Sequence, residues 1–273
     1  MTTHGPLFSR AFFFLFSLLA AWSAQADLIL SSPPRDTQAK EEEIYAPIVD
    51  LLTKASGQKV SFKYGENYVI YQSDMLKGKY DIVFDGPQFV GWRIAKLNHV
   101  PVAKFPGNLS FVLIARNDNV RIKEPKDLSG RMICAFPPPN LATISILSLY
   151  DNPVRQPKII EVQNFPEAYK QVLSGRCAAG ILQAKLFNDL DKEARAAKVL
   201  YTSPMYPNQA FTISSRVPAP ALDKMAKALL SSEGQVATEK LREAFKVPRL
   251  LPASAEEYKG LGGLLKDVWG FEM

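Results

Sequence analysis

Alternation between short apolar runs and longer helical patterns constrains the fold of this chain more than any other feature. The apolar run 28–30 is followed by two serines and two prolines, which is typical of a buried strand that ends in a loop. A helix follows, because apolar residues recur at helical spacing until Ser56-Gly57; they are Ile44, Tyr45, Ile48, Leu51 and Leu52. A strand at 59–64, a helix at 68–76 and a strand at 80–84 complete the unit. This order predicts a parallel sheet covered by helices.

The same alternation then begins again. Strands are expected at 111–115, 131–136, 159–162 and 178–182, and helices at 141–150 and 166–173. The tail from Pro218 onward has a helical apolar face and is expected to pack back on the first unit. The chain would then cross between units near 110–115 and 203–212. We therefore expect a two-lobed α/β fold, each lobe a mostly parallel sheet covered by helices, with residues 27–112 and 206–273 in lobe 1 and residues 113–205 in lobe 2.

The N-terminus has the pattern of a secretory signal peptide, expected to span residues 1–26. Arg10 precedes an apolar run at 11–22, and Ala24-Gln25-Ala26 supplies a small-x-small cleavage site. The run is shorter than the roughly 20 residues that a membrane anchor needs. No cysteine follows the cleavage site as an acceptor for lipid. We expect the mature protein to begin at Asp27 and to be free in the periplasm, without a lipid anchor.

The charge pattern argues against a nucleic-acid partner. The chain has 33 Lys+Arg and 27 Asp+Glu, a formal net charge of +6, but the basic residues are scattered among acidic ones. Such a distribution predicts solvated faces, with room for a basic cleft that holds an anion. With 47 % apolar residues the chain can form one large core or two modest ones. We expect a monomer.

The two cysteines, Cys134 and Cys177, leave two interpretations open. An oxidising compartment permits a disulfide, whereas a buried pair of free thiols would also fit. Their spacing matches no zinc or redox motif.

Four segments, at residues 45–52, 77–89, 115–118 and 127–130, together resemble those of the phosphate/phosphite/phosphonate-binding proteins of ABC importers. Residues 45–52 resemble the Tyr-x-Pro opening helix of that family, and residues 77–89 resemble its Gly-x-x-Asp-(apolar)-Gly-Pro-x-(aromatic) segment. Residues 115–118 and 127–130 resemble its interlobe strand and its Asp-Leu-Lys-Gly turn. The order and spacing match over about residues 28–190. The resemblance implies a type II periplasmic-binding-protein fold, in which two lobes close on a small-molecule ligand and deliver it to a membrane permease complex.

The chain departs from this family where the ligand oxygens would be held. The family's loop rich in Ser and Thr is replaced by Phe136, three prolines, Asn140, Leu141, Ala142 and Thr143. Prolines donate no backbone hydrogen bond, so fewer donors remain for an oxyanion. Phe89 also stands where family members present a tyrosine hydroxyl, and Cys177-Ala178 stands where they often have an acid. Phosphate or a simple phosphonate is therefore expected to bind weakly or not at all, and the natural ligand is expected to carry less charge or a larger apolar part, held against Tyr64, Phe89 and Tyr206.

Ligands of open α/β sheets sit beyond the carboxyl ends of the strands, so residues that follow strands are the candidates for binding. The candidates are Arg35, Tyr64, Gln88, Phe89, Asn108, Asn140, Thr143, Gln183, Tyr206 and Gln209. Simpler roles compete with binding for three kinds of residue. Asn140 suits a helix N-cap, Tyr64 and Tyr206 suit packing between lobes, and Arg35 suits an exposed loop.

The sequence offers little to an enzyme or a metal site. Of its two histidines, His4 lies in the signal peptide and His99 in a connection without an evident partner. A catalytic triad or a histidine-rich metal site is therefore not expected, and neither is a cofactor. We expect a periplasmic solute-binding protein that captures a small, phosphonate-like or other polar ligand between its two lobes for an ABC importer. The alternatives are a family member that binds a larger, partly apolar ligand or serves a sensor or envelope partner, and a periplasmic interaction protein without a small ligand.

Overall fold

The computed structural model describes residues 1–2, 27–268, 270 and 271. Residues 3–26 of the predicted signal peptide, with its cleavage site, therefore lie outside the described residues. None of the described helices combines the length and the apolar character that a membrane span requires.

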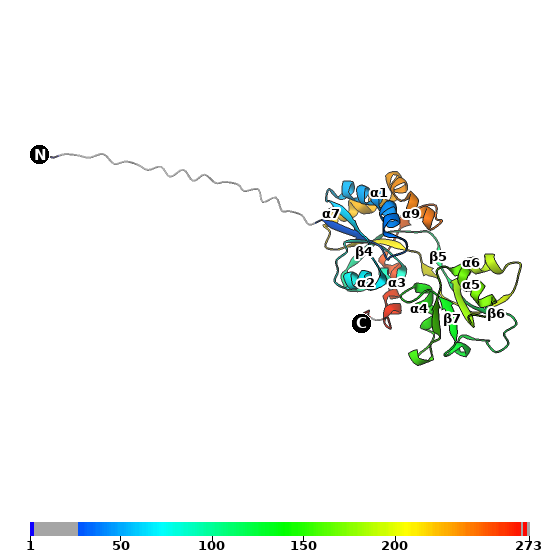
Figure 1. Cartoon of the computed structure of the whole chain (residues 1–273). Coiled ribbons are helices and arrows are strands. Elements are labelled where there is room, and N and C mark those ends of the chain that lie inside the picture. Colours follow the sequence, from blue (N-terminus) through cyan, green and yellow to red (C-terminus); the bar gives the residue numbers. More distant parts are fainter. Residues whose placement is uncertain (3–26, 269, 272–273) are drawn as a thin grey trace.

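Two sheets organise the chain. The strands of the first are β1 (Leu28–Ser31), β2 (Val60–Lys63), β3 (Ile82–Asp85), β4 (His99–Lys104), β12 (Ala210–Ser214) and β13 (Leu251–Pro252), in the order β13-β4-β12-β3-β1-β2. The strands of the second are β6 (Phe111–Arg116), β7 (Met132–Ala135), β8 (Lys158–Glu161), β9 (Ala179–Gln183) and β10 (Ala197–Thr202), in the order β10-β6-β9-β7-β8. Each sheet with its helices forms one lobe (Figure 1). The two-lobed α/β fold is confirmed.

The sheets are mixed rather than mostly parallel, which corrects the expectation for each lobe. In the first sheet β2, β1 and β3 run parallel, and in the second β8, β7 and β9 do. The strands next to the crossings, β4, β12, β6 and β10, pair antiparallel with their neighbours. The strand–helix alternation predicts only the parallel half, because the antiparallel pairs join strands that are far apart in the sequence: β4 with β12, and β6 with β9 and β10.

Helices cover both faces of each sheet. Their bounds are α1 (Gln38–Ser56), α2 (Tyr68–Leu76), α3 (Pro87–Leu97), α7 (Ala219–Leu230), α8 (Ser232–Ala237), α9 (Glu239–Ala244) and α10 (Ala255–Tyr258) in the first lobe, and α4 (Leu141–Leu147), α5 (Phe165–Leu173) and α6 (Ala184–Asp191) in the second. The described residues also form the 3₁₀ helices η1 (Pro125–Leu128), η2 (Pro153–Arg155) and η3 (Leu261–Leu265). In Figure 1, α1, α7 and α9 lie on one side of the first sheet and α2 and α3 on the other.

Alternation along the strands assigns each helix to a face. In the second sheet, Ile114 and Leu182 pack with Val172 of α5 in one buried cluster. Their neighbours on the same strands, Leu113 and Ile181, point to the other face and belong to the cluster that contains α4. In the first sheet, Leu30 and Phe84 pack with α1 and α7. α1 has the predicted apolar face and ends at Gly57, whose φ of 73° is left-handed.

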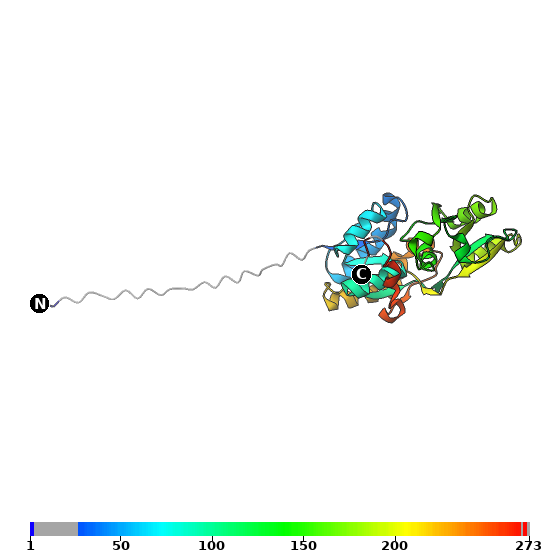
Figure 2. The ribbon, with the colours of Figure 1, turned by 90° about the horizontal axis from the view of Figure 1, so that it is seen from below.

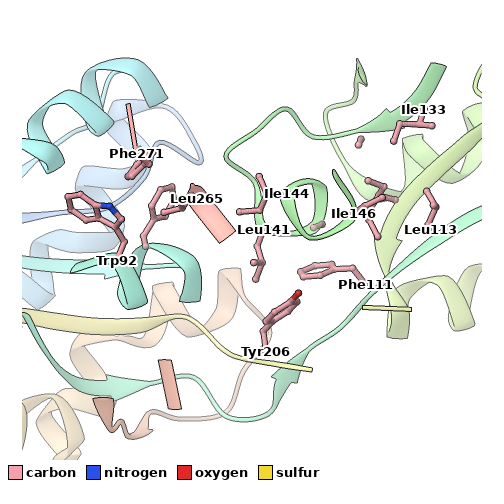
Figure 3. Close-up of a cluster of buried hydrophobic side chains, with 14 of the residues drawn as sticks. Trp92, Phe111, Leu113, Ile133, Leu141, Ile144, Ile146, Tyr206, Leu265 and Phe271 are labelled. Carbon is pink, nitrogen blue, oxygen red and sulfur yellow. The ribbon is translucent and has the colours of Figure 1, made fainter. Parts of the chain in front are cut away.

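One buried cluster belongs to both lobes. It joins Trp92 of α3 to Leu141 and Ile144 of α4, and it includes Leu265 and Phe271 from the C-terminal segment (Figure 3). This segment lies directly on α3, because Gly91 and Gly262 leave no room for a side chain between them: a Cβ on Gly91 would come within 2.7 Å of the Gly262 nitrogen. The C-terminal residues are thereby held at the junction of the lobes (Figure 1).

The chain crosses between sheets twice, once between β4 and β6 and once between β10 and β12. The first crossing precedes the predicted 110–115, because that run is itself strand β6. The two connections pair with each other through β5 (Asn108–Leu109) and β11 (Tyr206–Pro207). Placement of the lobe boundaries at 112/113 and 205/206 stays a prediction.

Candidate functional site

A cleft of about 400 Å³ lies where the two lobes meet. Its walls come from the loop after β1, the start of α3, the start of α4, the residues after β8 and the end of β9. These are the carboxyl ends of strands in both sheets, where open α/β sheets hold their ligands. A larger surface hollow of about 640 Å³, lined by Arg116, Arg131 and Arg176, is separate from the cleft. It lies at the opposite end of the second sheet, where β7 and β9 begin.

The cleft collects six of the ten residues predicted for binding. They are Arg35, Gln88, Phe89, Asn140, Gln183 and Gln209. Figure 2 views the two lobes from below, with the elements of the first on one side of the junction and those of the second on the other. Whether these side chains bind a ligand stays a prediction.

Arg35 is the charged residue of the cleft. Its backbone N–H donates to Glu41 Oε1 (2.9 Å), and Ser32 donates to the other oxygen of the same buried carboxylate (2.7 Å). The Arg35 guanidinium makes no ion pair or hydrogen bond with the described residues and lies 5.5 Å from the ring centroids of Phe84 and Phe245. Glu41 therefore fixes the loop, while the cation remains available.

Gln88 links the lobes at the floor of the cleft. Its Nε2 donates to the Pro139 carbonyl across the junction (3.0 Å), and its side chain is only 4 % exposed. Since a carbonyl can only accept, the Gln88 amide must turn its nitrogen towards Pro139, which leaves Oε1 buried without a partner. Gln209 also lines the cleft and has a buried Oε1 without a partner. Unsatisfied acceptors at this place would suit a ligand that brings an N–H or O–H donor.

Asn140 and Thr143 are occupied by the fold. Asn140 caps α4, because its Oδ1 accepts from the Ala142 N–H (3.0 Å). Thr143 is fully buried and donates to the Phe136 carbonyl (2.6 Å). Thr143 thus lies outside the cleft lining, and Asn140 has only its amide nitrogen left to donate.

Three further candidates lie outside the cleft lining. Asn108 is exposed in β5, where it pairs with Pro207. Tyr64 donates to the Asp36 carbonyl (2.9 Å). Tyr206 is buried, with its ring centroid 6.4 Å from that of Phe111. The structure gives each of the three a packing or hydrogen-bonding role of its own.

Several lining residues were missed in the sequence. The additional lining side chains are Pro33, Pro34, Tyr68, Pro87, Leu109, Phe111, Phe136, Leu141, Gln163 and Phe165. Gln163 and Phe136 come shortly after β8 and β7, so the same rule on strand ends points to them. Burial raises the pKa of the Tyr68 hydroxyl, and the neighbouring positive charge of Arg35 partly offsets this. Tyr68 is therefore a neutral donor at the edge of the cleft.

A buried ion pair lies behind the cleft. Arg93 Nε donates to Asp85 Oδ2 (2.5 Å), Arg93 Nη2 donates to the Tyr71 hydroxyl (2.9 Å), and Tyr71 donates to Asp85 Oδ1 (2.5 Å). All three side chains are fully buried. Asp85 ends β3 and is followed by Gly86 and Pro87 of the cleft wall, so the network fixes the start of α3.

Cys134 and Cys177 form a disulfide in the second lobe, with Cα atoms 5.7 Å apart. Cys134 lies in β7 and Cys177 just before β9, and these two strands pair in parallel. No cluster of three or more His, Cys, Asp or Glu side chains able to hold a metal occurs in the described part of the chain.

Comparison with known proteins adds a family and a fold. The family model described as "ABC transporter, phosphonate, periplasmic substrate-binding protein" matches residues 30–258. The phosphate-import protein PhnD of Mycolicibacterium smegmatis is 26 % identical over 121 residues, a match that covers 41 % of this chain and only 37 % of that relative's length.

Solved structures resemble the whole two-lobed fold. XAC2383 from Xanthomonas citri, solved with ATP, matches with a TM-score of 0.69 at 11 % identity and covers 91 % of this chain and all (100 %) of that one. PhnD1 from Prochlorococcus marinus, solved with methylphosphonate, matches with a TM-score of 0.62 at 14 % identity and covers 89 % of this chain and 98 % of that one. At these identities the likeness shows the fold alone.

Proposed function

This chain belongs to the phosphonate-type periplasmic substrate-binding proteins of ABC transporters, and from that premise we propose that it captures a small acidic or polar solute, carrying at most one negative charge, in the cleft between its lobes. The loaded protein would then deliver the solute to the membrane permease of an importer. We also propose that it acts as a monomer, without catalysis, after export through its signal peptide and without a lipid anchor.

The observation that carries the proposal is Arg35. Arg35 lines the cleft, and its guanidinium forms no salt bridge with the described residues, although the negative charges of Glu41 and Asp85 are near enough to act on it, so an acidic group of a ligand would pair with it directly. The surrounding polar groups are neutral amides and the Tyr68 hydroxyl, which orient a ligand without adding charge.

The limit of one negative charge follows from the supply of donors. A buried dianion needs most of its oxygens hydrogen-bonded, and an uncompensated buried charge costs several kcal/mol. Residues 137–139 are prolines and donate nothing, and the Thr143 hydroxyl is already bonded to Phe136. Phe89, Phe111, Phe136 and Phe165 line the cleft instead. These walls favour a ligand that is partly apolar, although PhnD1, which shares the fold, was solved with methylphosphonate.

Isothermal titration calorimetry of the purified protein tests this proposal. We expect monocarboxylates or other monoanions to bind more tightly than phosphate. Arg35→Gln should weaken binding by roughly 10- to 100-fold, because a hydrogen bond to a charged group contributes about 1.5–3 kcal/mol. Arg176→Gln removes the same charge from an exposed site at the far end of the second lobe and should leave affinity unchanged. Sub-micromolar binding of a simple phosphonate that Arg35→Gln leaves intact would refute the proposal.

The importer partner is tested in cells. Uptake of the identified ligand should be lost on deletion of the gene and restored by the wild-type protein. Normal uptake in the deletion strain would instead favour a sensor or other envelope partner.

A further inference from the structure

A second cavity of about 340 Å³ adjoins the cleft on the far side of Tyr68. Tyr68 lines both cavities, and Pro139, which lines the second, accepts the hydrogen bond from Gln88 on the floor of the first. The two cavities therefore border each other at the Tyr68 ring, next to the Gln88–Pro139 hydrogen bond between the lobes.

Three segments enclose the second cavity, and each presents carbon to it. Val69 comes from α2, Ile144 and Leu147 come from α4 after the proline loop, and Leu264 and Val268 come from the C-terminal segment. Figure 3 shows Ile144 of the second lobe facing Leu265 of the C-terminal segment. The cavity exists only where both lobes and this segment meet.

Four polar side chains, Gln72, Ser148, Gln156 and Asp267, line the second cavity, and three of them are either bonded to the protein or carry the wrong sign for an acid. Ser148 donates to the Ser145 carbonyl (3.0 Å) and Gln156 donates to the Leu147 carbonyl (3.3 Å). Asp267 also lines the cavity and would repel a second negative charge. The cavity therefore suits an uncharged, apolar group.

We propose that the second cavity is a subsite for the apolar tail of the cleft ligand, so that the ligand is a monoanionic acid with an unbranched alkyl tail, and any N–H or O–H of its head would donate to Gln88 Oε1 or Gln209 Oε1. This inference rests on the proposed function, since Arg35 would hold the acidic head in the cleft while the tail passes Tyr68. The volume equals that of about ten water molecules, which leaves room for several methylene groups.

Exposure of the lining supports an occupant. Val69 is 63 % exposed although it lines an apolar cavity, so a tail that covers it would remove apolar surface from water. Because α2 and α4 belong to different lobes, a tail in this cavity would contact both lobes only when they are closed together. Binding of the tail would therefore favour the closed state.

A homologous series tests the subsite. Affinities of acetate, butanoate, hexanoate, octanoate and decanoate, and of the matching alkylphosphonates, are measured by calorimetry with the purified protein. Affinity should rise about fourfold for each added methylene that becomes buried, and should level off once the cavity is full.

Two tryptophan variants locate the tail. Val69→Trp should fill the second cavity and abolish the dependence on chain length while it leaves the affinity of the shortest acid unchanged. Ile70→Trp is the matched control, because Ile70 is the next residue of α2 and is also exposed but does not line the cavity. Thermal unfolding checks that both variants fold.

The outcomes separate the subsite from the proposed function. If short acids bind in a manner that depends on Arg35 but affinity does not rise with chain length, the subsite is wrong and the function stands. A chain-length dependence that persists in Val69→Trp places the tail elsewhere and also overturns the subsite. If no acid of either series binds, both proposals fall.

Discussion

At the scale of single residues, two arginine–aspartate pairs among the described residues of the first lobe lie in opposite surroundings. Arg93 and Asp85 are fully buried, whereas Arg216 and Asp81 pair at the surface, with the Arg216 side chain 59 % exposed. Removal of one partner from an exposed ion pair changes the free energy of unfolding little. Removal of one partner from a buried pair is costly, because the other charge stays buried without compensation. The two pairs therefore form a controlled comparison within one domain.

Arg93→Met should lower the free energy of unfolding by about 3–5 kcal/mol, because Asp85 would remain buried without its cation. Arg216→Met should cost about 0–1 kcal/mol. Urea denaturation followed by circular dichroism measures both. The double variant Arg93→Met with Asp85→Leu should recover part of the loss, since no charge then stays buried. Equal effects of the two single arginine variants would contradict this interpretation.

His99 makes stability depend on pH. Burial, together with the positive charges of Arg93 and Arg216, lowers the pKa of His99 from 6.5 to about 3. The unfolded chain takes up this proton below pH 6.5, whereas the folded protein keeps His99 neutral, so stability is lost as the pH falls from about 6.5 to about 3. The loss should approach 1.4 kcal/mol per pH unit within that window.

His99→Gln isolates this contribution, because glutamine does not titrate and can retain a hydrogen bond to the Thr212 hydroxyl, which lies 3.1 Å from Nδ1. Free energies of unfolding are compared between wild type and variant from pH 7 to pH 4. Carboxylates such as Asp74, whose pKa two lysines lower, affect both proteins alike and cancel in the difference. Parallel pH profiles would show that His99 titrates normally in the folded protein.

At the scale of elements, periodic segments could be predicted and aperiodic ones could not. α1 follows from its apolar spacing and from Gly57, and its bounds end where predicted. α3 has no readable period, because residues 87–93 are all buried. The rule on strand ends found Gln88 and Gln183 but missed Tyr68, which begins α2 several residues after β2 ends. Thr143 turns to the Phe136 carbonyl, a contact that the sequence does not specify.

The disulfide constrains two elements of the second lobe. It closes a loop with a sequence separation of 43 between β7 and β9. A loop of this length corresponds to about 4 kcal/mol of stabilisation, because the cross-link restricts the unfolded chain. Dithiothreitol should therefore lower the free energy of unfolding of the wild type by about that amount.

The variant Cys134→Ala with Cys177→Ala serves as the control for reduction. Its stability should match that of the reduced wild type and should not respond to dithiothreitol. Mass spectrometry after alkylation reports whether the thiols are blocked before reduction. Alkylation of both cysteines in the unreduced native chain would mean that they are free thiols.

At the scale of the whole molecule, the lobes are joined by two adjacent connections and by contacts that cross the cleft. β5 and β11 pair the connections side by side, and the Gln88–Pro139 hydrogen bond and the cluster around Ile144, Leu265 and Phe271 hold the lobes together. Each lobe also has a buried cluster of its own. The junction can therefore change while each lobe keeps its core, which is the arrangement needed for closure on a ligand.

Ile144→Asp should separate the lobes, because a charge placed among Leu265 and its neighbours is costly to bury when the lobes meet. Small-angle X-ray scattering of the ligand-free protein should show a larger radius of gyration. Ligand affinity should fall in proportion to the fraction of molecules that remain closed, since only the closed arrangement completes the cleft. Val154→Asp adds the same charge to the second lobe at an 87 % exposed position and should change neither quantity. An Ile144→Asp protein that is folded by circular dichroism and scatters like the wild type would show that the shared cluster does not hold the lobes together.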